Sequence, residues 1–188
     1  MIDWTSRRWD FTVTPHFRTQ SEQAVLKSKD WDYEMAFPDD LLKDAFHLAA
    51  RGGNNPKQSS LRRAVSTAYY ALFHLLVADF VLNWKTEDQR VRLGRMFEHS
   101  KMKNAFFKPR SSSATPAQTE LLKVIEAFGQ LQNDRHAADY DVAKDWTRAD
   151  AMSSLNVAVD AFKTWKSIRK EKIAQDHLLT VFGARRVV

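Results

Sequence analysis

Residues 133–141, NDRHAADYD, concentrate charged groups, one histidine and one tyrosine directly after a long segment with the periodicity of a helix. Arg135 ends a helical stripe with i, i+4 and i+7 spacing, so its guanidinium is expected to face inward. A partly buried guanidinium needs an acceptor, and Asp139 and Asp141 are the nearest carboxylates in sequence. The predicted chemistry is therefore recognition of an anion, either one of these carboxylates or a phosphate. The stripe is formed by Leu121, Ile125, Phe128, Gln132 and Arg135.

The same stretch has a purely structural interpretation. Arg135, Asp139 and Tyr140 are then a polar latch that ends the helix and fixes the turn into the next one. Tyr69 and Tyr70 of an earlier helix carry hydroxyl groups that need a partner, and Asp139 or Arg135 is the expected one. The alternative is a site at which these groups act on a bound molecule.

Signals that start helices recur along the chain. A capping side chain, followed by proline or by an acid or amide three residues later, occurs at Asn55, Thr86, Thr115 and Thr147. They predict four principal helices, preceded by a shorter helix that ends at the two glycines 52–53. Few glycines and no convincing alternating apolar runs argue against a sheet, so we expect an all-α antiparallel bundle of four to five main helices. The predicted helices span residues 38–51, 57–84, 87–107 with a break near His99, 116–136 and 148–180.

The predicted organisation is one helical domain with an extension at each end. A chain of 188 residues is long enough for one domain with a sizeable core. Residues 1–36 are rich in aromatic side chains and are expected to pack across the bundle, with stacking on RNA bases as the alternative use of these rings. Residues 37–182 form the bundle, and residues 183–188 are a C-terminal tail.

Composition and missing motifs exclude several classes of protein. The chain has no cysteine, which excludes disulfide scaffolds, thiol catalysis and cysteine-based zinc sites. It also has no Walker A loop, no G-x-S-x-G, no H-E-x-x-H and no dinucleotide fingerprint. Its most apolar run, residues 68–84, is shorter than the roughly 20 residues that a bilayer needs and contains His74 and Asp79, so a buried helix is expected and no membrane partner. No basic stretch leads into an apolar one at the N-terminus, so a cytoplasmic location is expected.

The formal net charge of +6 makes nucleic acid a candidate partner. One basic cluster lies between residues 101 and 110 without an acid in it, and a second runs from residue 163 to the C-terminus. Such patches attract phosphates whatever the base sequence, although a surface helix solvated by lysines has the same composition. The candidate RNA-binding residues are Lys101, Lys103, Lys108, Arg110, Arg169, Lys170 and Lys172.

Four blocks of the sequence, taken together, resemble one family. They are LRRAVSTAYYALFHLL (residues 61–76), EHS with FF following (residues 98–107), RHAADYD (residues 135–141) and TRADAMSSLNVAVDAF (residues 147–162). In this order on consecutive helices they resemble the HEPN superfamily, all-helical domains named for higher eukaryotes and prokaryotes nucleotide-binding. The resemblance covers about residues 38–166 and leaves out the N-terminal extension.

The resemblance implies an RNA-directed function. Many members of the family look like metal-independent endoribonucleases. They carry an R-x4-6-H motif at the position of residues 135–140, and two copies of the motif usually meet across a homodimer. In such a site Arg135 steadies charge on the phosphorane, while His136 or His99 takes the proton of the RNA 2′-OH or protonates the leaving oxygen. No metal and no cofactor are expected. The implied setting is a toxin, phage-defence or stress system, with RNA, a second copy and a nucleotidyltransferase or other antitoxin as candidate partners.

The sequence departs from the family motif at one position. Tyr140 occupies the place of the histidine, so the spacing is R-x4-Y, and His136 is turned by about 100° around the helix from Arg135. Arg92 and His99 fit R-x6-H by count, but they belong to a different helix. A noncatalytic module that binds RNA or nucleotide, or that mediates dimerisation, therefore stands beside the ribonuclease. The candidate catalytic residues are Arg135, His136, Asp139, Tyr140 and His99.

Overall fold

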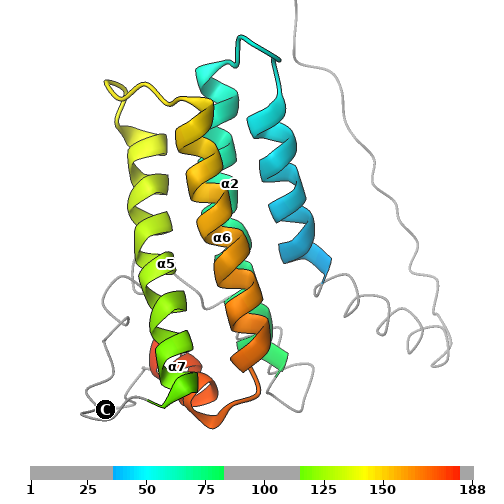
Figure 1. The fold of residues 1–188 in the computed structure, drawn as a ribbon, viewed down its shortest axis with the longest axis vertical. Helices are drawn as coiled ribbons and strands as arrows, with labels where there is room; N and C mark the ends of the chain where they lie inside the picture. The colour runs from blue at the N-terminus through cyan, green and yellow to red at the C-terminus, as the bar shows by residue number, and fades with distance from the viewer. Residues whose placement is uncertain (1–35, 83–114, 183–188) are drawn as a thin grey trace, which may run out of the picture. The chain divides into compact units, whose positions relative to one another are not determined.

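The computed structural model describes residues 36–82 and 115–182, and these residues form five helices packed together (Figure 1). No strand occurs in the two described ranges, so the prediction of an all-α bundle is confirmed. The predicted helix over residues 87–107, the N-terminal extension and the C-terminal tail lie outside the described residues. The helices are residues 36–50, α2 (Gln58–Leu82), α5 (Pro116–Tyr140), α6 (Arg148–Ile168) and α7 (Lys172–Phe182).

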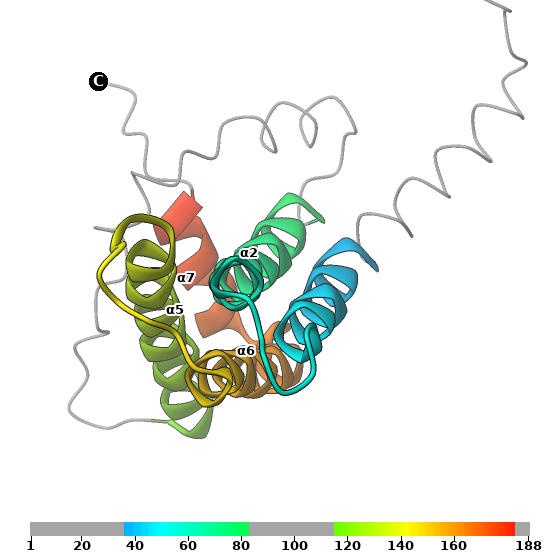
Figure 2. The same ribbon diagram turned by 90° about the horizontal axis from the view of Figure 1, so that it is seen from above.

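Helix α2 lies at the centre of the bundle and packs against α5, α6 and α7 (Figure 2). Sixteen of its 25 side chains are buried, which is the pattern of a helix covered on nearly all sides. Among the described helices, α2 alone is long and apolar enough to cross a membrane, but most of its apolar window is buried inside the bundle. It therefore serves as the core helix of this fold.

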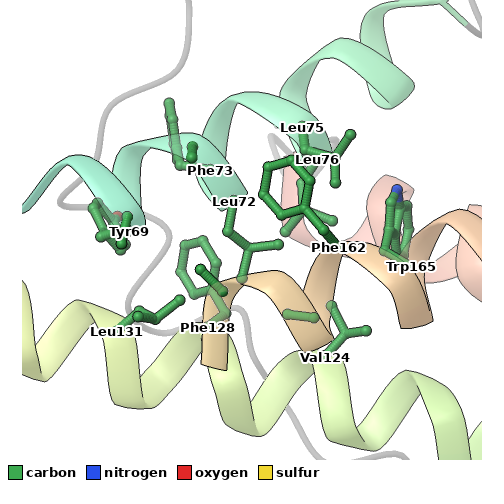
Figure 3. Packing of buried hydrophobic residues seen from close by; sticks show 14 of the residues in the cluster. Tyr69, Leu72, Phe73, Leu75, Leu76, Val124, Phe128, Leu131, Phe162 and Trp165 are labelled. Carbon is green, nitrogen blue, oxygen red and sulfur yellow. The ribbon is translucent and has the colours of Figure 1, made fainter. Parts of the chain in front are cut away.

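Large side chains from α2, α5 and α6 interleave in the core (Figure 3). Tyr69 and Leu72 of α2 meet Phe128 of α5, while Phe162 and Trp165 of α6 lie nearer the other end of the cluster. Each of these side chains is buried, and burial of one such apolar group stabilises the fold by about 1.5–3 kcal/mol. The packing holds α2 and α5 side by side along their length, which brings together the side chains of the candidate site.

Local sequence accounts for several helix ends. Thr115 accepts a hydrogen bond from the backbone N–H of Gln118, with proline at the first helical position of α5. Thr147 and Asp150 form a complete capping box at the start of α6. The helix over residues 36–50 is followed by Gly52, whose φ of 90° belongs to the left-handed region that favours glycine. The predicted starts of α5 and α6, and the predicted end of the first helix at the two glycines, are confirmed.

The predicted start of α2, residue 57, is one residue early. Asn55 and Pro56 precede the helix, and the carbonyl of Lys57 accepts the first helical hydrogen bonds. The Gln58 side chain does not serve its own helix: its Nε2 donates to the carbonyl of Trp146 at 2.8 Å, and its Oε1 accepts from the Trp146 N–H at 3.0 Å. This paired contact joins the start of α2 to the loop before α6.

The predicted single helix over residues 148–180 is wrong, because the chain turns between α6 and α7. Arg169 ends α6, and its guanidinium lies 3.5 Å from the Asp79 carboxylate of α2. Trp165 Nε1 donates to the same carboxylate at 2.5 Å. Burial raises the pKa of Asp79, although the hydrogen bond from Trp165 and the charge of Arg169 act in the opposite direction. A buried acid of another helix thus holds the end of α6.

The fold predicts a specific pH dependence of stability. Burial lowers the pKa of His177 from 6.5 to about 4. As pH falls from 6.5 towards 4, the unfolded chain takes up a proton at this histidine and the folded chain does not. The free energy of unfolding should therefore fall with decreasing pH, by up to about 3 kcal/mol. Urea unfolding of the protein and of His177→Gln, from pH 7 down to 4.5, measures the difference in slope.

The comparison of the two proteins removes the contribution of Asp79, whose raised pKa has the opposite sign and is common to both. His177→Gln should show the flatter profile. Equal profiles for the two proteins would show that His177 titrates normally in the fold.

Candidate functional site

Arg135 lies near the C-terminal end of α5 and forms an ion pair within its own helix. Its Nε donates to Asp139 Oδ2 at 3.0 Å, and the spacing of four residues brings the two side chains onto one stripe. The side chains are only 19% and 27% exposed, so the pair is screened less than a surface pair. The expected inward-facing guanidinium and its carboxylate partner are both present.

The second oxygen of Asp139 is held by another helix. Ser66 of α2, which is buried, donates through Oγ to Asp139 Oδ1 at 2.5 Å. One carboxylate oxygen therefore faces α2 and the other holds Arg135. A carboxylate with both oxygens engaged has little rotational freedom, so it fixes the direction of the guanidinium.

Two tyrosine rings of α2 lie beneath the guanidinium. Arg135 Cζ is 5.7 Å from the ring centroid of Tyr69 and 5.4 Å from that of Tyr70. The expected contact was with the hydroxyl groups, whereas these distances are those of cation–π contacts. Burial raises the pKa of Tyr69 to about 12, with Arg135 and a hydrogen bond to Gln132 acting in the opposite direction, so Tyr69 is not an acid–base group near neutral pH.

The charge of Arg135 is kept in this environment. Burial alone lowers the pKa of Arg135, but Tyr70, Asp139, Tyr69 and Tyr140 together raise it above its ordinary value. Within the described part of the chain its Nη1 and Nη2 have no hydrogen-bond acceptor, and neither atom is fully buried. The side chain is anchored through Nε and its ring contacts, while the four N–H groups at its tip point to no carboxylate of the described residues.

His136 and Tyr140 lie on the next stripe of α5, outside the Arg135–Asp139 pair. Their ring centroids are 5.0 Å apart, His136 is exposed, and Tyr140 is 63% exposed. Because α5 remains helical through Tyr140, one turn beyond the predicted end, His136 does not turn towards the guanidinium. The hydrogen-bonded part of the polar latch therefore contains Arg135, Asp139 and, unexpectedly, Ser66, whereas Tyr140 adds no hydrogen bond to it among the described residues.

Arg62 of α2 holds the end of α5, and sequence reasoning missed it. Its Nη1 donates to the carbonyls of Ala138 at 3.0 Å and Asp141 at 2.9 Å. Its Nη2 donates to the backbone carbonyl of Lys144 at 2.5 Å. These carbonyls lie at or beyond the last turn of α5, where backbone acceptors lack helical partners. The i, i+4 spacing of Arg62 and Ser66 was the available signal, since it places both on the face of α2 towards α5.

Three of the candidate RNA-binding residues lie in the described part of the chain, and two of these three are ion-paired. Arg169 is paired with Asp79, and Lys172 Nζ lies 2.5 Å from Asp176. Lys170 is exposed and has no acid partner in the described ranges, while Lys101, Lys103, Lys108 and Arg110, like His99, lie outside them. The described residues hold 14 lysines and arginines and 14 acids, so the whole surplus of +6 belongs to the remaining residues.

Metal ligands do not gather in the described part of the chain: no group of three or more His, Asp or Glu side chains is placed to hold an ion there. Comparison of the chain with protein-family models, with curated proteins and with solved structures finds no match.

The Ser66 hydroxyl should contribute more to stability than a hydroxyl that serves only its own helix. Ser66→Ala removes a hydrogen bond to a charged group, which is worth about 1.5–3 kcal/mol. Thr67→Val is the matched control, because Thr67 Oγ1 donates only to the carbonyl of Arg63, a neutral bond worth about 0.5–1.5 kcal/mol. Chemical denaturation of both variants measures the difference, and an equal loss in the two would contradict the assigned role of Ser66.

Proposed function

We propose that this protein is an RNA-directed member of the HEPN type and acts as a metal-independent endoribonuclease at the C-terminal end of α5. The observation that carries the proposal is the Arg135 guanidinium, which is anchored through Nε while Nη1 and Nη2 have no acceptor in the described residues. A guanidinium with two such groups binds phosphate oxygens in a bidentate manner. Its fixed position costs little further entropy when a phosphate binds.

The proposed reaction uses the RNA itself as the nucleophile. The 2′-oxygen forms a bond to the adjacent phosphorus, the bond from phosphorus to the 5′-oxygen breaks, and a cyclic phosphate and a 5′-hydroxyl result. His136 is the proposed group that takes the proton of the 2′-OH or delivers one to the 5′-oxygen. Arg135 stabilises the negative charge that develops on the phosphorane oxygens. Each step is balanced without a metal ion, and DNA is not cleaved because it lacks the attacking hydroxyl.

The outward position of His136 favours a site shared by two copies. Within one chain the histidine and the guanidinium lie on different stripes of α5. In a homodimer that brings two α5 ends together, His136 of one copy serves the phosphate held by Arg135 of the other. The resemblance to HEPN domains supplies this arrangement, and the exposed rings of His136 and Tyr140 lie where such a contact requires them.

A noncatalytic module is the second candidate function, and two features favour it. Arg135 already has a carboxylate partner, Asp139, which is itself tied to α2 by Ser66. Tyr140 stands where the family motif has its histidine. In this case the network stabilises the bundle, and the protein binds RNA or nucleotide or pairs with a partner such as a nucleotidyltransferase without cleaving.

Cleavage of RNA in the presence of EDTA tests the first function. The protein should produce fragments ending in a cyclic phosphate, and Arg135→Ala and His136→Ala should each reduce the rate by at least about 100-fold, the scale of one acid–base or electrostatic group. Gel analysis of a labelled RNA gives the rates. Lys123→Gln removes a charge at the far end of α5 from Arg135 and should leave cleavage near the wild-type rate.

Fragment formation and the melting temperature of Arg135→Ala together distinguish the two candidate functions. If the wild-type protein yields no fragments and Arg135→Ala only lowers the melting temperature, the noncatalytic function is correct. Cleavage that stops on chelation would contradict the metal-independent mechanism.

A further inference from the structure

The first turns of α2 lie beside the last turns of α5, as the Arg62 contacts with Ala138 and Asp141 show. Arg63, the next residue, makes no such contacts. It is exposed, and its side chain has no hydrogen-bond acceptor within the described residues. Arg63 precedes Ser66 by three residues and Tyr70 by seven, so it continues their side of α2. Since Ser66 holds Asp139 and the Tyr70 ring lies under Arg135, Arg63 is a second cation on the same side of the α2–α5 contact.

A third cation stands at this end of the bundle. Lys144 lies in the loop after α5, and its Nζ is 3.8 Å from the centroid of the Trp146 ring. The loop is fixed at both sides of the lysine, by Arg62 at the Lys144 carbonyl and by Gln58 at the Trp146 backbone. Lys144 is exposed and has no ion-pair partner in the described ranges. Its ammonium group is therefore held near the end of α5 without a direct ion pair, although its charge helps to lower the pKa of Asp150.

An exposed aromatic ring accompanies these cations. Tyr140 is 63% exposed, lies one turn beyond His136 and contacts its ring. Tyrosine that is exposed to this degree contributes little to the core, because most of its apolar surface stays in water. Basic groups interleaved with an accessible ring are the recurring means by which proteins bind a single strand: the cations track phosphates and the ring stacks on an unpaired base.

Most of the candidate basic residues at the other end of the bundle are ion-paired. Helices α5 and α6 run antiparallel, so Arg169 and Lys172, near the end of α6 and the start of α7, lie at the opposite end from Arg135 (Figure 1). Both are paired with acids, as is Lys166, which lies 2.8 Å from Asp39. Lys170 is the one candidate residue described at this end that has no acid partner among the described residues. Ion pairs of this kind cancel much of the field that attracts phosphate. Arg63 and Lys144 have no such partners among the described residues.

We infer that a single strand of RNA binds across the contact between the first turns of α2 and the last turns of α5, with phosphates at Arg135 and Arg63 and an unpaired base on the Tyr140 ring. This inference rests on the proposed function and adds the path of the strand and a role for Tyr140. Tyr140 is then a base-stacking residue rather than a replacement for the family's histidine in proton transfer. A duplex is disfavoured, because its bases are already stacked and their faces are closed to the ring.

Fluorescence anisotropy with a labelled oligonucleotide of about 12 uridines tests this surface. At several salt concentrations, Arg63→Gln should reduce the slope of log K against log salt by about 0.7, the value for one lost phosphate contact on a single strand. Lys123→Gln is the charge-matched control on α5, at the far end from Arg135 and paired with Glu120, and it should leave the slope unchanged. A matched duplex should bind more weakly than the single strand.

Two substitutions at Tyr140 distinguish stacking from proton transfer. Tyr140→Leu removes the ring and should weaken binding about tenfold, the effect of losing one stacked base. Tyr140→Phe keeps the ring and removes the hydroxyl, so it should bind the oligonucleotide more tightly than Tyr140→Leu does. Loss of cleavage with normal binding in Tyr140→Phe would overturn the stacking role.

The outcomes separate this inference from the proposed function. If the wild-type protein binds the oligonucleotide but the slope falls with Lys170→Gln and Lys172→Gln and not with Arg63→Gln, the strand lies at the other end and the inference is overturned while RNA binding stands. Absence of any binding by a wild-type protein that melts normally would overturn both. Thermal melting of Arg63→Gln should match the wild-type curve, since the side chain is exposed.

Discussion

The organisation of this end of the bundle depends on one requirement: a guanidinium drawn between two helices must keep its charge and find partners for it. Arg135 satisfies the requirement in two directions, through the Asp139 carboxylate on its own helix and through the ring faces of Tyr69 and Tyr70 on α2. Neither contact uses a hydrogen bond from Nη1 or Nη2. Because Ser66 holds the other oxygen of Asp139, the direction of the guanidinium is set by the packing of α2 against α5 and not by α5 alone. The polar groups thus depend on the apolar core for their position.

Contacts between side chains and backbone make the same end of the bundle well defined. Arg62 binds carbonyls at the end of α5, and Arg148 binds the carbonyls of Ala49, Ala50 and Gly53 at the end of the helix over residues 36–50. Both arginines satisfy helix ends that would otherwise rely on water. The structural cations and the available ones therefore share one region. This combination suits a site that must bind an anion without rearranging.

The features that could be predicted from the sequence are those that depend on periodicity within one helix. The stripe ending at Arg135 and the carboxylate four residues later follow from the geometry of a helix, and both are present. Ser66 and Arg62 could not be assigned as partners, because their contacts depend on the register of α2 against α5, which no local signal gives. The break after Ile168 was missed for the same reason: no glycine or proline marks it, and it is accompanied by a contact with Asp79 from a distant part of the chain. The extra turn of α5, at whose end Tyr140 lies exposed, involves Arg62 as well.

The central claim is that the tip of Arg135 is available to a phosphate while its Nε is held by Asp139. Nitrogen NMR of the arginine side chains during titration with a single-stranded RNA tests it most directly, with Arg135→Lys used to assign the signals. We expect the Nη resonances of Arg135 to move and narrow as RNA is added. Its Nε, which is already hydrogen-bonded in the free protein, should show little change. Saturable binding of RNA that leaves the Nη resonances of Arg135 unmoved would contradict the account.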